Sequence, residues 1–112
     1  MGIALTHSIS PGISRCELSH RQREQIDVAR AAAQHDAYCR MLDECGYRVV
    51  ETDVNAAHPD STFIEDTAVA VDELAVLCRP GVESRRGEVD GIEPVLARYR
   101  PLERITKPAT LE

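Results

Sequence analysis

The stretch TAVAVDELAVLC, residues 67–78, holds two short apolar runs separated by Asp72 and Glu73. Runs of this length on either side of a two-residue gap predict a β-hairpin, although Asp-Glu lacks the glycine or asparagine that a tight primed turn prefers. Because both runs are apolar on alternate positions and beyond, we expect both strands to be covered on both sides.

A long helical pattern precedes this hairpin. Ser19, with Gln22 three positions later, has the pattern of a capping box and predicts the start of the helix. Gly46 is a suitable residue to end it. Apolar residues recur at spacings of three and four and form one narrow stripe, which we expect to lie against a sheet: Ile26, Ala29, Ala33, Ala37, Met41 and Cys45.

Strands are predicted on either side of this helix, at Gly2–Thr6 and Tyr47–Thr52, and residues 13–18 are predicted to be a loop. A second helix, ended by Pro101, precedes a last strand that begins at Leu102. Its apolar residues at helical spacing are Ile92, Val95, Leu96 and Tyr99, with Pro94 inside the pattern. Strands and helices alternate, so the fold class is α/β. A helix followed by a strand occurs twice, at 20–52 and 85–106, which is a coarse internal repeat.

Composition and charge are those of an ordinary globular protein of one domain, with 112 residues, 43% hydrophobic and 29% charged. The net charge of −6 argues against a nucleic-acid partner, which needs a clustered basic surface. The chain has no apolar run of the roughly 20 residues that a membrane span needs, and its first residues lack the features of a signal peptide. We therefore expect a cytoplasmic protein without a membrane partner.

The cysteines and histidines do not form a recognisable metal motif. The four cysteines (Cys16, Cys39, Cys45 and Cys78) contain no C-x-x-C pair, and the four histidines (His7, His20, His35 and His58) contain no pair at i, i+4. Disulfides are rare in the cytosol. The sequence therefore predicts buried free thiols, no metal and no cofactor, and we expect burial to raise the pKa of Cys78 at the end of its strand.

An adjacent carboxylate pair, Glu65 and Asp66, stands at the start of the first hairpin strand. Carboxylates that are partly desolvated at a strand end need a cationic partner, or their pKa values rise. A guanidinium matches them because its planar fork of donors fits a carboxylate. Two solvated loop acids would give the same pattern.

Twin arginines, Arg85 and Arg86, lie at the start of the second predicted helix. An arginine there could bind a ligand carboxylate. A surface ion pair with Glu83 or Glu88, which would contribute little stability, is the alternative. Asp60, in a loop that contains proline, reads by itself as a turn residue.

Together these segments resemble the dimethylarginine dimethylaminohydrolase family of the pentein, or guanidino-group-modifying, superfamily. The resemblance covers nearly the whole chain and is carried by HPDSTFIED (58–66), RPG (79–81), ESRRGE (83–88), QHDAY (34–38) and TLE (110–112). It implies a propeller of five ββαβ modules, of which this chain would supply the first module and the start of the second. Residues 1–112 would then be the N-terminal part of a single pentein catalytic domain, which is compatible with a homodimer.

The resemblance also assigns site residues. Asp66 and Glu112 would hold the guanidinium of the substrate. The other residues that would line the substrate pocket are Leu18, Asp60, Glu65 and Arg85. Arg85 would face the α-carboxylate, and Leu18 would act through its backbone carbonyl on a mobile lid loop.

The reaction implied is hydrolysis of asymmetric dimethylarginine or monomethylarginine to citrulline and a methylamine, with a place in arginine metabolism and nitric oxide regulation. A cysteine thiolate and a histidine carry the chemistry in the family, at positions downstream of the one that matches Glu112, and none of the four cysteines here matches the nucleophile. Arginine deiminases share the acidic pair, so that branch stays open. A non-catalytic binding module for arginine-like ligands is the other alternative.

Overall fold

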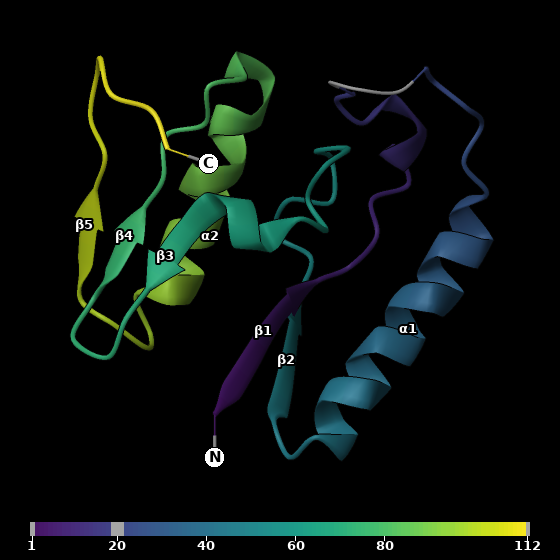
Figure 1. Cartoon of the computed structure of the whole chain (residues 1–112), viewed down its shortest axis with the longest axis horizontal. Helices are drawn as coiled ribbons and strands as arrows, with labels where there is room; N and C mark the ends of the chain where they lie inside the picture. The colour runs from purple at the N-terminus through teal and green to yellow at the C-terminus, as the bar shows by residue number, and fades with distance from the viewer. Residues whose placement is uncertain (1, 19–21, 112) are drawn as a thin grey trace. The chain divides into compact units, whose positions relative to one another are not determined.

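A computed structural model describes residues 2–18 and 22–111 (Figure 1). The chain divides into two compact units, Met1–Thr62 and Phe63–Glu112. Both units contain two parallel strands joined by a helix, which confirms the α/β class. None of the helices within the described residues combines the length and apolarity that crossing a bilayer requires.

The first unit contains β1 (Ile3–His7), a 3-10 turn η1 (Ile13–Arg15), α1 (Val28–Glu44) and β2 (Arg48–Thr52). β1 and β2 pair in parallel, from Ile3 opposite Arg48 to His7 opposite Thr52. Parallel neighbours need a crossover, and α1 provides it. His7 is fully buried and holds the ends of both strands, because its Nε2 accepts from the backbone N–H of Asn55 and its Nδ1 donates to the carbonyl of Ser8.

The predicted start of α1 was wrong. Asp27 is the N-cap, and its carboxylate accepts from the backbone N–H of Arg30 at 3.0 Å. Ser19 lies outside the described residues, and residues 22–26 are not helical. Tertiary contacts hold this segment as a loop, since Arg23 donates to the carbonyls of Ser14 and Cys16. The predicted end was correct, because Gly46 follows the C-cap with a φ of 93°.

The predicted inner face of α1 was also wrong. The stripe from Ala29 to Cys45 is exposed, whereas the half-buried face consists of Val28, Ala31, Ala32, His35, Cys39 and Leu42. Alanines occur around much of this helix, so the pattern could not distinguish one face from the other. Contact with β2 determines which face of α1 lies inward.

The second unit contains η2 (Ile64–Thr67), β3 (Ala68–Ala70), β4 (Ala75–Leu77), η3 (Glu83–Arg85), α2 (Arg86–Leu96) and β5 (Leu102–Arg104). Its sheet has the order β3-β4-β5, antiparallel and then parallel. The strand and helix order of this unit is therefore ββαβ. Its buried core lies between α2 and β4 and includes Ala75, Leu77, Val89 and Ile92.

The predicted hairpin is confirmed, but its predicted coverage was wrong for β3. Val71 donates to the carbonyl of Leu74 and closes a turn over Asp72 and Glu73 that needs no left-handed residue, because no described non-glycine residue has a positive φ. Val69 and Val71 are about half exposed, at 48% and 49%. Among the described strands β3 lies at an edge of its sheet, while α2 covers β4.

Replacing the cap of α1 should weaken the first unit. We expect Asp27→Ala to lower the free energy of unfolding by about 1 kcal/mol, because one backbone N–H at the helix start loses its acceptor. Asp27→Asn keeps an acceptor and serves as the matched control, with little change expected. Urea denaturation followed by circular dichroism measures both, and equal losses in the two variants would contradict the capping role.

Candidate functional site

The acidic pair and the twin arginine lie in the second unit, where one guanidinium joins three elements. Arg85, the last residue of η3, donates from Nε and Nη2 to the two carboxylate oxygens of Glu88 in α2, both at 2.9 Å. Its Nη1 donates to Asp66 Oδ2 of η2 at 2.8 Å. Nη2 also donates to the carbonyl of Phe63 at 3.3 Å. We call Asp66, Arg85 and Glu88 the guanidinium cluster.

Two members of the guanidinium cluster, Arg85 and Glu88, are largely shielded from water. The side chain of Glu88 is 2% exposed and that of Arg85 is 12% exposed, whereas Asp66 is 39% exposed. Burial lowers the pKa of Arg85, but the hydrogen bonds and negative charges of Glu88 and Asp66 outweigh it and raise the pKa overall. Arg85 is therefore a fixed cation. The alternative of a surface ion pair with Glu83 or Glu88 was right about Glu88 as a partner and wrong about the surface, because Glu88 is buried.

Glu88 is the residue of this cluster that the sequence did not single out as functional. The sequence indicated Glu88 only as a possible partner of the twin arginines in a surface ion pair. The available signal was its i, i+3 spacing from Arg85 at a helix start, where the two side chains can meet. Its bidentate contact fixes the plane of the guanidinium and hence the direction from which Asp66 is held.

Asp66 already accepts a guanidinium N–H, which is the chemistry that the sequence predicted for it. Here the donor is Arg85 of the same chain, so the binding of a substrate guanidinium stays a prediction. The adjacent Glu65 lies in the same 3-10 turn and is exposed. The predicted contact between Arg85 and a substrate α-carboxylate also stays a prediction.

Asp60 and Leu18 lie together in the first unit. Asp60 is buried, and both of its carboxylate oxygens accept from the backbone N–H of Glu17, at 3.2 and 3.1 Å. Leu18, the next residue, is 41% exposed and lines a pocket of about 160 Å³. Asp60 is therefore more than a turn residue, because it anchors the segment that presents Leu18. Glu112 lies outside the described residues.

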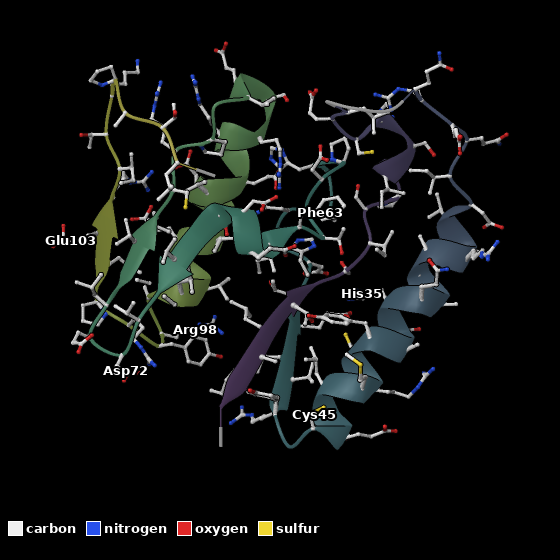
Figure 2. The ribbon with its side chains drawn as sticks, in the orientation of Figure 1. His35, Cys45, Phe63, Asp72, Arg98 and Glu103 are labelled. Atoms are coloured by element: carbon white, nitrogen blue, oxygen red, sulfur yellow. The ribbon has the colours of Figure 1, made fainter. Side chains whose placement is uncertain are left out.

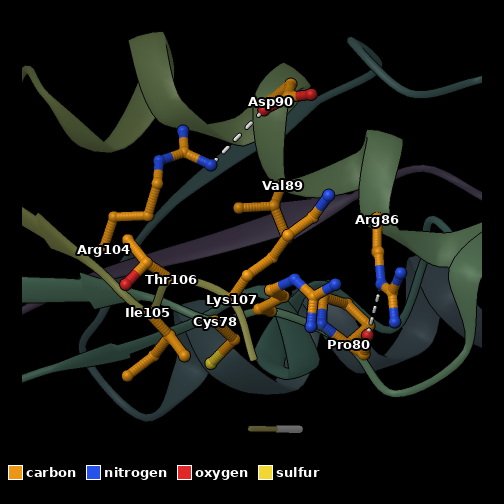
Figure 3. Close-up of a pocket in the computed structure, with 10 residues that line it drawn as sticks. Cys78, Pro80, Arg86, Val89, Asp90, Arg104, Ile105, Thr106 and Lys107 are labelled. Carbon is orange, nitrogen blue, oxygen red and sulfur yellow. Dashed lines mark hydrogen bonds and ion pairs between the residues drawn. The ribbon is translucent and has the colours of Figure 1, made fainter. Parts of the chain in front are cut away.

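The twin arginines serve different parts of the second unit. Arg86 donates to the carbonyls of Pro80 and Gly81 and lines a second pocket, of about 280 Å³, that Arg85 does not line (Figure 3). Arg104, also on that pocket, is paired with Asp90 and Glu93. The residues predicted to bind substrate do not line this pocket.

Cys78 is a poor candidate nucleophile. It is 3% exposed, and burial, followed by the negative charge of Asp66, raises the pKa of its thiol. The rise expected from the sequence is confirmed.

Two sequence relatives of this chain are bacterial proteins named dimethylarginine dimethylaminohydrolase. The protein of that name from Streptomyces coelicolor is 39% identical over 95 residues, which are 85% of this chain and 37% of that protein. The one from Pseudomonas aeruginosa is 41% identical over 88 residues, or 77% of this chain and 35% of that protein. The chain thus spans little more than a third of these curated relatives. No protein-family model matches it.

Solved structures with the same fold include both distant and more similar proteins. The N-terminal domain of ArgZ, an arginine dihydrolase, superposes on 96% of this chain with a TM-score of 0.77 at 17% identity, and the match covers 41% of that domain. At this identity the likeness shows the fold alone. A dimethylarginine dimethylaminohydrolase mutant from Pseudomonas aeruginosa complexed with citrulline matches 96% of this chain and 43% of its own, with a TM-score of 0.89 and 34% identity. The chain is thus a homologue of part of the dimethylarginine dimethylaminohydrolases, and the resemblance seen in the sequence is confirmed.

Breaking the guanidinium cluster should be far more costly than breaking an exposed pair on the same helix. We expect Glu88→Ala to lower the free energy of unfolding by about 3 kcal/mol, because it leaves Arg85 largely buried with one carboxylate fewer. Glu93→Ala, which removes a partner of the more exposed Arg104, is the control and should cost less than about 1 kcal/mol. Urea denaturation of both variants makes the comparison, and similar losses would contradict a buried cluster.

The raised pKa of Cys78 should appear as slow alkylation. The folded thiol stays protonated to higher pH than the same thiol in the unfolded chain, so its reactivity with iodoacetamide should rise at higher pH in the folded protein than in urea. Mass spectrometry of the Cys78 peptide after timed alkylation between pH 7 and 10 measures the pH dependence in both states. The same pH dependence in the folded and unfolded states would contradict the expectation.

Proposed function

We propose that this chain contributes substrate-binding residues to a hydrolase that converts Nω-methylated arginines to citrulline and a methylamine. The observation that carries the proposal is the Asp66 carboxylate, which accepts a guanidinium N–H at 2.8 Å in a chain related to enzymes named for this reaction. The substrate would be a small molecule. The homodimer and the cytoplasmic location stay predictions from the sequence.

The residues predicted to bind substrate, and Glu88 behind them, have separate roles in this proposal. Asp66, together with Glu112, binds the substrate guanidinium and keeps its positive charge near the reacting carbon, which stays electrophilic. Arg85 faces the α-carboxylate, and Glu88 holds Arg85 in place. Glu65 lines the pocket, while Asp60 anchors the segment from which the carbonyl of Leu18 contacts the substrate.

The chemical steps require a nucleophilic cysteine, which none of the four cysteines of this sequence matches, and a catalytic histidine. The thiolate attacks the guanidinium carbon, and the carbon–nitrogen bond to dimethylamine breaks as the histidine donates a proton to the leaving amine. The same histidine then takes a proton from water, whose oxygen attacks the carbon. The carbon–sulfur bond breaks, which releases citrulline and restores the thiolate.

The test uses the product of the longest open reading frame that contains this sequence. Incubated with asymmetric dimethylarginine, it should release citrulline and dimethylamine in equal amounts. Asp66→Asn should lower kcat/KM by about 100-fold, because one charge that stabilises the cationic guanidinium is lost. Asp72→Asn, the same change in the exposed hairpin turn, is the matched control and should leave kcat/KM unchanged.

Other outcomes identify the alternatives. Ammonia and citrulline from arginine, with no turnover of the methylated substrate, would assign the arginine deiminase branch. Binding of arginine or methylarginine without any citrulline would assign a non-catalytic module. No binding and no citrulline would overturn the proposal as a whole.

A further inference from the structure

Three potential metal ligands of different chemistry meet between α1 and β2 in the first unit. His35 and Cys39 lie one turn apart on the helix, and Glu51 lies on the strand that the helix covers. Figure 2 shows His35 on the side of α1 that faces β1 and β2. One ligand atom of each residue lies within 4.8 Å of the other two.

The distances match those of a tetrahedral zinc site. His35 Nε2 lies 3.0 Å from Glu51 Oε2, and Cys39 Sγ lies 3.6 Å from His35 Nε2 and 3.8 Å from Glu51 Oε2. Zinc bonds of about 2.3 Å to sulfur and about 2.0 Å to nitrogen or oxygen, at tetrahedral angles, separate the ligand atoms by about 3.3 to 3.5 Å. Each measured distance lies within about 0.3 Å of that range.

We propose that His35, Cys39 and Glu51 bind Zn²⁺ or a similar thiophilic divalent cation, with a fourth position left to water. A thiolate, a carboxylate and a neutral imidazole carry a total charge of −2, which balances the ion. On binding, the thiol of Cys39 loses its proton to solvent, and His35 presents the lone pair of Nε2 as a neutral imidazole. The ion would join α1 to β2.

The arrangement differs from that of a catalytic cysteine. In a nucleophile–histidine–carboxylate triad, the imidazole contacts the nucleophile with one nitrogen and the carboxylate with the other. Here Cys39 Sγ and Glu51 Oε2 both approach the same atom, His35 Nε2. Three ligand atoms this close to one another can bind a single metal ion, whereas a triad needs both nitrogens of the imidazole.

The burial of the site also suits an ion. The His35 side chain is 9% exposed, so a bond between its nitrogen and the metal would be shielded from water. Glu51 is 46% exposed, which leaves a path by which the ion can enter. The hydroxyl of the buried Thr6 lies 3.7 Å from Cys39 Sγ and could orient the thiolate. The sequence prediction of no metal considered only histidine pairs and C-x-x-C, so the mixed pair at i, i+4 was missed.

Cobalt provides a direct test, because a cobalt–thiolate bond absorbs in the near ultraviolet. The untagged, reduced chain should bind one equivalent of Co²⁺ with this absorption, and Zn²⁺ should displace it and raise the melting temperature. Cys39→Ser should abolish the absorption. Cys45→Ser, a change of the other cysteine at the end of the same helix, is the matched control and should keep it (Figure 2).

A second variant separates ligand loss from unfolding. Glu51→Gln keeps the size of the side chain and should keep the cobalt–thiolate absorption while weakening the dissociation constant at least tenfold. No absorption with the unchanged chain would overturn the proposal, and so would absorption that survives Cys39→Ser or disappears with Cys45→Ser. Binding of Co²⁺ that is equal in all three variants would indicate nonspecific binding and would also overturn it.

Discussion

The arrangement of the second unit depends on the ion pairs that the guanidinium of Arg85 makes with Glu88 and Asp66. Glu88 is buried, and an ionised carboxylate at 2% exposure is tolerated only with a well-placed cation. Arg85 supplies that cation and at the same time contacts Asp66 and the carbonyl of Phe63. Arg85 therefore links η2 to the first turn of α2. The ion pair between Arg85 and Glu88 fixes the guanidinium that holds Asp66.

The two units use the same strand–helix–strand plan with different amounts of apolar burial. α2 places Val89, Ile92 and Val95 in the core of its unit, whereas α1 has no fully buried residue. The inner face of α1 instead presents His35 and Cys39 to the strand that carries Glu51. Polar contacts thus carry part of the attachment of α1, and a bound ion would add to them where apolar packing is thin.

Four of the residues that the resemblance assigned to substrate fall into two pairs with different supports. The carboxylate of Asp60 accepts from the backbone N–H of Glu17, 43 residues away in sequence, and so holds the segment that carries Leu18. Asp66 and Arg85 depend on Glu88, which lies in the first turn of a helix. In both pairs a buried carboxylate holds a residue that would meet the ligand: Asp60, itself predicted to line the pocket, in the first pair and Glu88, which was not, in the second.

The sequence by itself determined the features that depend on neighbouring residues: the hairpin at 67–78, the end of α1 at Gly46 and the α/β order. The motif from His58 to Glu88 was long enough to identify the family. The tertiary structure decided the start of α1, which of its faces lies inward, the exposure of β3 and the partners of Arg85, Asp60 and Cys39. Most of these choices depend on contacts between residues far apart in the chain, such as Arg85 with Asp66 and Asp60 with Glu17. A local pattern cannot encode such contacts when alanine lies on several faces of a helix or when a carboxylate has several possible partners.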